Sequence, residues 1–207
     1  MPETDTNTAV PAYLNETTGA ITDGDAWVSI CSAKITNDSG LTDVTFESTT
    51  GKNNWSQYQD LCLLGHLRVT DGGAQYHLNF NDSTSGYIFQ LMDQGATSGS
   101  GVTVRSYAEY GGGRGEATVR LANNATPAYT FTPAMTWFAD INSAKQKVFW
   151  TQAGWAGYTP DGMVSIVNNR WESQDPITKI KIWTSGTAIA DHSRFELYGI
   201  LSRIVAP

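Results

Sequence analysis

The sequence predicts an all-β fold, an antiparallel two-sheet sandwich of jelly-roll type with an extended N-terminal arm. Three observations predict it: short runs of alternating apolar and polar residues, turn-forming clusters between these runs, and no alternation of strands with helices. The length of 207 residues suits a single domain of this class. Charged residues make up only 16% of the chain and aromatic residues 11%, which is typical of a folded core rather than of disorder.

The arm is predicted at residues 1–24. This segment is rich in Thr, Asn, Asp and Glu and shows no sustained two-residue periodicity. A polar segment of this kind stays ordered only when a surface holds it, either on its own domain or on a neighbour. We therefore expect residues 1–24 to form an arm and residues 25–207 to form one sandwich domain.

The strand pattern begins after the arm and repeats to the C-terminus. We expect strands at 27–33, 44–47, 61–69, 74–80, 87–92, 102–107, 117–121, 135–141, 147–151, 163–167, 177–183 and 194–201. Asp71-Gly72-Gly73 lies between two alternating runs and tolerates positive φ, so it predicts a β-hairpin at 61–80. Only residues 54–64 carry a weak helical pattern.

Composition and charge exclude several classes of partner. The net charge of −7 would repel nucleic acid, and no basic stripe is longer than the pair Lys179 and Lys181. No stretch of 18 apolar residues predicts a membrane span, and the N-terminal residues do not resemble a signal peptide. Cys31 and Cys62 are too few for a disulfide framework, and we expect two buried free thiols, as in a protein made in a reducing cytoplasm.

The C-terminal run carries a recognisable motif. Its residues are Ile177, Ile180 and Ile182, then Ser185-Gly186 and Ile189, then Ser193-Arg194-Phe195-Glu196-Leu197-Tyr198-Gly199-Ile200. This resembles the closing hairpin of a family of phage virion proteins that end in an Ile-rich strand followed by Gly-Ser-x-Phe-x-Leu-Tyr-Gly-Ile. The resemblance covers about 24 residues and implies a structural role in the particle or in host contact. Where the family has Gly, this chain has His192, one of the few residue types enriched at positive φ.

The motif also has a direct physical interpretation. Phe195, Leu197 and Gly199 point to one face of the last strand, while Tyr198 and Ile200 point to the other. Ile180 and Ile182 are expected to line the preceding strand. A strand that is apolar on one face and partly on the other is typical of a central sandwich strand, or of one whose outer face meets another subunit.

Catalytic and metal-binding patterns are weak. His66, His77 and His192 have no metal-ligand spacing, and no Gly-x-Ser-x-Gly elbow occurs. We predict no enzyme activity, no metal and no cofactor, although paired carboxylates leave no sequence signature, so the acids Asp140, Glu172 and Glu196 stay candidates for a glycosidase. Calcium could be bound by the oxygen atoms of Asp23, Asp25, Asn37 and Asp38. We prefer the interpretation that these residues form turns.

Carbohydrate binding is the main alternative. Trp155 and Tyr158 lie among glycines in a segment expected to form a loop, and Trp171 follows, so these three residues are candidate contacts for a glycan or a partner. For Trp155 and Tyr158, a purely structural role is an equally good interpretation. A structural role is the preferred interpretation for Trp137, Trp150 and Trp183, which we expect to fill the sandwich core.

The sequence therefore predicts a non-catalytic bacteriophage virion protein made in the host cytoplasm. We expect a capsid decoration or head-surface protein, because the chain shows no coiled-coil or repetitive shaft of the kind a fibre carries. Its expected partners are the major capsid protein or tail proteins and further copies of itself in a homo-oligomer, with a trimer as a common solution. The alternative is a tail-tip or receptor-binding module that recognises host surface glycans.

Overall fold

A computed structural model describes residues 27–36, 40–70, 75–95, 103–107, 115–120, 130–156 and 162–201. These residues form strands and two one-turn 3-10 helices, η1 (Gly51–Asn53) and η2 (Trp55–Gln57). The strands are β1 (Trp27–Lys34), β2 (Asp43–Glu47), β3 (Asp60–Leu67), β4 (Gln75–Phe80), β5 (Tyr87–Gly95), β6 (Thr103–Tyr107), β7 (Gly115–Arg120), β8 (Thr132–Ala139), β9 (Lys147–Ala156), β10 (Gly162–Trp171), β11 (Lys179–Thr184) and β12 (Arg194–Ile200). Each segment expected to be a strand overlaps one of them.

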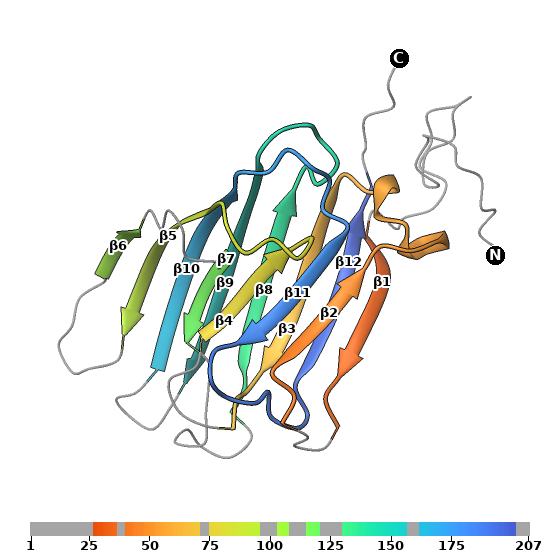
Figure 1. The fold of residues 1–207 in the computed structure, drawn as a ribbon. Helices are drawn as coiled ribbons and strands as arrows, with labels where there is room; N and C mark the ends of the chain where they lie inside the picture. Colours follow the sequence, from red (N-terminus) through yellow and green to blue (C-terminus); the bar gives the residue numbers. More distant parts are fainter. Residues whose placement is uncertain are drawn as a thin grey trace, which may run out of the picture.

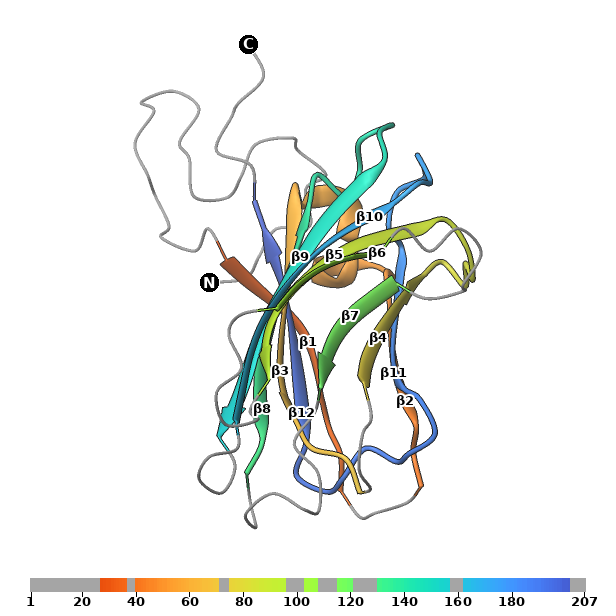
Figure 2. The same cartoon turned by 90° about the vertical axis from the view of Figure 1, so that its left-hand side faces the viewer.

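The strands form two antiparallel sheets that face each other, as Figures 1 and 2 show. The larger sheet has eight strands in the order β1-β12-β3-β8-β9-β10-β5-β6, and the smaller has four in the order β2-β11-β4-β7. When β5, β6, β9 and β10 are set aside, each remaining strand lies in the opposite sheet from the strand before it. The exception is the pair β4 and β7, which both lie in the smaller sheet. This is the two-Greek-key arrangement of a jelly roll, so the predicted fold class is confirmed. The remaining four strands extend the larger sheet at one side (Figure 1).

The expected connections between strands were wrong in two places. The hairpin predicted at 61–80 does not form, because β3 pairs with β12 and β8 in the larger sheet while β4 pairs with β11 and β7 in the smaller. The closing hairpin at the C-terminus does not form either, since β11 and β12 belong to different sheets. An alternating pattern tells which face of a strand is buried, but not which strand lies beside it. In a jelly roll, consecutive strands commonly pack face to face across the core.

The core between the sheets is aromatic at its centre. The Phe80 ring of β4 contacts Phe149, Phe138 and Trp171 of the larger sheet, with ring centroids 4.9, 5.6 and 5.4 Å away. All four side chains are at most 3% exposed. Edge-to-face contacts of this kind add to the apolar burial that stabilises the sandwich. The smaller sheet therefore covers the inner face of the larger one.

The C-terminal motif is built into this core as predicted. β12 lies between β1 and β3 in the larger sheet, and its inner residues Phe195 and Leu197 are fully buried, as are Ile180 and Ile182 of β11. A Cβ atom at Gly199 would lie 2.4 Å from the Tyr58 ring, so this position requires glycine.

The turn before β12 also follows the prediction. His192 has a φ of +67°, so this position adopts the positive φ that the sequence suggested. The next residue, Ser193, is fully buried, and its Oγ accepts a hydrogen bond of 3.1 Å from the amide of Arg68. This bond fixes the start of β12 against the end of β3.

Other expectations are settled only in part. Residues 1–24 lie outside the described residues, so the arm and the boundary of the domain at residue 25 stay predictions. The weak helical pattern at 54–64 corresponds to η2 followed by β3. None of the described helices is long and apolar enough to cross a membrane.

Candidate functional site

The candidate site is the face of the larger sheet that points away from the smaller sheet, here called the outer face. Strand register places its side chains in cross-strand rows. One row runs through Tyr198, Cys62, Trp137, Trp150, Asn168 and Gln90, from β12 to β5. The next row runs through Glu196, Leu64, Met135, Gln152, Ile166 and Met92. The outer face is therefore largely apolar across six strands.

An aromatic cluster covers one half of the outer face. Trp27 of β1 reaches across β12 and β3 to Trp137 of β8, with ring centroids 5.5 Å apart and the rings edge to face. Trp27 also contacts Tyr198 at 6.2 Å. Cys62 has no exposed surface although it lies on the outer face. We attribute this burial to the cluster, because Cys62 is the register neighbour of both Tyr198 and Trp137.

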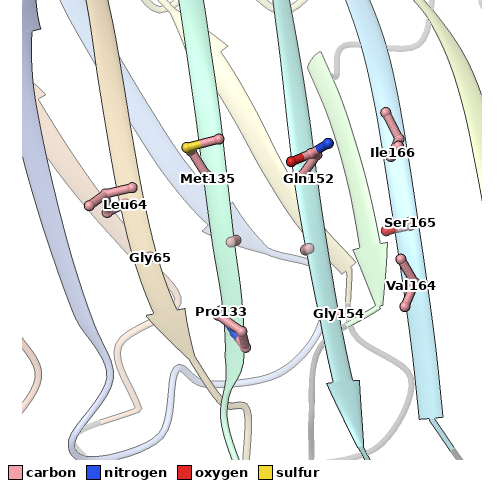
Figure 3. A pocket seen from close by; sticks show the side chains of 11 residues that line it. Leu64, Gly65, Pro133, Met135, Gln152, Gly154, Val164, Ser165 and Ile166 are labelled. Atoms are coloured by element: carbon pink, nitrogen blue, oxygen red, sulfur yellow. The ribbon is translucent and has the colours of Figure 1, made fainter.

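A shallow groove of about 590 Å³ occupies the other half. It crosses β3, β8, β9 and β10, and Figure 3 shows Met135, Gln152 and Ile166 side by side on three neighbouring strands. Leu64 and Val164 also line it. Its lining is apolar apart from Gln152 and Ser165, so the groove offers shape and apolar surface but few groups that bind a polar ligand.

The two carboxylates of the outer face are already engaged by neighbouring side chains. Asp60 accepts a hydrogen bond from Trp137 Nε1 at 3.2 Å and another from the amide of Asp140 at 2.8 Å. Glu196 accepts one from the Tyr198 hydroxyl at 2.9 Å, and this bond is the main reason why the pKa of Tyr198 is raised. Both acids therefore hold aromatic residues in place.

Burial changes the pKa of two further titratable groups of the outer face. Burial raises the pKa of the Cys62 thiol to about 11, so this cysteine is a poor nucleophile at neutral pH. Burial, and secondly the nearby Arg194, lower the pKa of His66, whose ring stacks on Phe131 with centroids 4.7 Å apart. Cys31 and Cys62 are both free, as expected, although Cys31 is only partly buried.

The structure describes the predicted contact residues only in part. Trp171 is 3% exposed and packs in the core between Phe80 and Tyr87, so its interpretation as a contact residue was wrong. Trp155 lies in β9, paired with Met163, rather than in a loop. Its side chain and all of Tyr158 lie outside the described residues. Trp137 and Trp150, expected in the core, are partly exposed on the outer face instead.

The catalytic candidates belong to different elements. Asp140 lies in the turn after β8, Glu172 follows β10 and forms an ion pair with Arg170 at 3.0 Å, and Glu196 lies within β12. The calcium candidates Asp23, Asp25, Asn37 and Asp38 lie outside the described residues. Within the described ranges, no three His, Cys, Asp or Glu side chains are grouped so that they could hold a metal ion.

Sequence reasoning missed most of the outer face, although a signal was present. Leu61–Leu64, Val148–Trp150 and Ile166–Val167 are runs with apolar residues at consecutive positions, so both faces of the strand are apolar. In an antiparallel sheet such runs indicate that the second face is covered as well.

Comparisons of the chain with protein-family models, with curated proteins and with solved structures found no match.

Proposed function

We propose that this chain is a non-catalytic structural protein of a bacteriophage virion that assembles through the outer face of its larger sheet. One observation carries the role of the face. Five large apolar side chains of the described residues are exposed, and four of them lie on the outer face: Trp27, Met92, Val148 and Val164. Exposed polar side chains, among them Gln90, Gln152 and Asn168, lie between them, so the face has the mixed apolar and polar composition of a protein interface.

The C-terminal motif supports the virion context. Its residues Phe195, Leu197 and Gly199 belong to the core, while Tyr198 belongs to the outer aromatic cluster. A sequence that resembles phage virion proteins at this strand therefore combines a sandwich core with a contact surface. Within the virion we propose a capsid decoration protein on the head, attached through residues 1–24 and a sheet surface.

The separation of two carboxylates supports a role without catalysis. Among the described residues, Asp60 and Glu196 are the acids of the outer face, and they lie about four residues apart along neighbouring strands, since Asp60 pairs with Ile200. Four residues correspond to roughly 13 Å along a strand. Glycosidases place their two carboxyl groups roughly 5 to 9.5 Å apart.

The test is the position of the chain on the particle. Antibodies raised against the purified protein should label the heads of intact phage particles in electron micrographs. Deleting residues 1–24 should abolish this labelling while the purified variant keeps a β-sheet circular dichroism spectrum. Labelling of the tail tip alone, or full head labelling by the deletion variant, would contradict the decoration role.

A second candidate, recognition of host glycans at the tail tip, is favoured by one feature of the outer face. Trp137 and Trp150 are register neighbours, Asn168 lies in the same row, and Gln152 lies in the next row. Rings that stack on sugars need such neighbours to bind hydroxyl groups. Trp150→Ala, like Trp155→Ala and Tyr158→Ala, should then reduce adsorption to host cells, whereas Trp183→Ala on the smaller sheet should not.

A further inference from the structure

The occupant of the outer face follows from which of its residues are exposed. Val164 is 64% exposed, Val148 51% and Met92 46%, and these three residues lie on adjacent strands β10, β9 and β5. These aliphatic side chains offer no hydrogen bonds to the hydroxyl groups of a sugar. The face also exposes Gln90, Gln152 and Asn168, and such a mixture of apolar and polar groups matches a protein interface.

The charge of the outer face indicates which kind of protein partner could pack against it. The chain carries a net charge of −7, with 20 acidic and 13 basic residues. Outer-face side chains that the structure describes include three basic and two acidic ones: Lys34, Arg170, Arg194, Asp60 and Glu196. Two copies of the chain repel each other over most of their surface, but not here. A near-neutral face is compatible with an identical face and gives no complement to a strongly charged partner.

The size of the face fits a stable pair. From β1 to β5 the larger sheet spans six strand spacings, or about 29 Å, and its rows extend about 20 Å along the strands. The flat area is on the order of 600 Å², close to the roughly 800 Å² that each partner contributes to a standard interface. Two sheet faces can pack at about 10 Å with interdigitated side chains, as the two sheets of a sandwich do.

We propose that the outer face packs against the same face of a second copy, so that the protein is a two-fold pair joined sheet to sheet. This inference rests on the proposed function, because it names the partner of the surface assigned there. In such a pair Val148 and Val164 lie in the interface of both copies. A carboxylate introduced at either position is buried in the interface without a partner, which is strongly unfavourable.

The test compares the full-length chain with two variants by sedimentation equilibrium at about 1 to 100 μM. The wild type should have the mass of two chains. The double variant Val148→Glu/Val164→Glu should have the mass of one, with the dissociation constant raised at least about 100-fold. Leu41→Glu is the matched control, because Leu41 is 40% exposed but lies between β1 and β2, off the outer face. It should pair like the wild type.

Each other outcome counts against the inference. A wild type that stays monomeric at about 100 μM overturns it, and so does a mass of three chains or pairing by the double variant. If the monomeric wild type also protects Trp27 from oxidation by N-bromosuccinimide, the chain's own N-terminal segment covers the face instead. Particle labelling separates the two proposals: a monomer on phage heads refutes only the pairing, whereas a pair absent from particles refutes only the virion role.

Discussion

The two faces of the larger sheet are built by the same strands but differ in what covers them. On β10, Val167 points to the inner face and has no exposed surface, while Val164 points to the outer face and is 64% exposed. The smaller sheet covers the inner face, and no described element covers the outer one. Folding of the single chain therefore accounts for the apolar residues of the inner face only. Those of the outer face are best explained by association.

The largest effect should come from opening the inner face at its centre. Phe80→Ala removes a fully buried ring that contacts Phe138, Phe149 and Trp171. The free energy of unfolding should fall by about 3 to 5 kcal/mol, through lost apolar burial and the cavity left behind. Urea denaturation measures it, and a loss below about 1 kcal/mol would show that Phe80 is not central to the core.

A smaller loss is expected where the C-terminal motif meets the inner face. Gly199→Ala places a Cβ atom against the buried Tyr58 ring, 2.4 Å from its nearest carbon, and should cost about 1 to 3 kcal/mol by overpacking. In a Tyr58→Leu background the same substitution should cost less, because the ring is gone. An equal cost in both backgrounds would mean that the strand backbone, and not the ring, requires glycine.

The two valines of β10 provide a matched comparison of the faces. Val167→Ala should lower the free energy of unfolding by about 2 kcal/mol, because it leaves a cavity. Val164→Ala should change it by less than about 0.5 kcal/mol in the monomer. Thermal denaturation at low protein concentration measures both. Equal effects would remove the distinction between a face needed for folding and a face available for contact.

A further prediction concerns the aromatic cluster over Cys62. With a pKa of about 11, only about one Cys62 thiol in 1,000 is ionised at pH 8, so alkylation should be slow and should accelerate about tenfold per pH unit below pH 11. Trp27→Ala should lower the free energy of unfolding by at most about 1.5 kcal/mol. It should speed the alkylation of Cys62, which mass spectrometry can identify. Rapid alkylation of Cys62 in the wild type would contradict the conclusion that the aromatic cluster shields this thiol from solvent.

Local patterns were sufficient to predict the strands. Alternation and turn residues located them, and the buried positions Phe195 and Leu197 followed directly from the two-residue period. Strand pairing was not predictable in the same way. The segments around Asp71-Gly72-Gly73 read as a hairpin, yet they join two sheets, because the choice between pairing and crossing depends on contacts distant in sequence, such as β3 with β12.

The candidate site was harder to predict than the fold. Trp155 and Trp171 attracted attention as large rings near glycines, but ring size does not tell whether a residue points to the core or to solvent. The informative feature was consecutive apolar residues, as at Val148-Phe149-Trp150, where one residue fills the core and its neighbours face outward. Which side of a sheet lacks a cover depends on the whole topology, and no local pattern encodes it.

The most direct test of the outer face as a contact surface is hydroxyl-radical footprinting of the wild-type chain over a range of protein concentrations. Pairing through this face predicts that oxidation of Met92, Trp27 and Val164 falls as the concentration rises, while oxidation of Leu41 stays constant. Equal oxidation of Met92 and Val164 at all concentrations, with the protein sedimenting as a pair, would place the interface elsewhere and contradict the account.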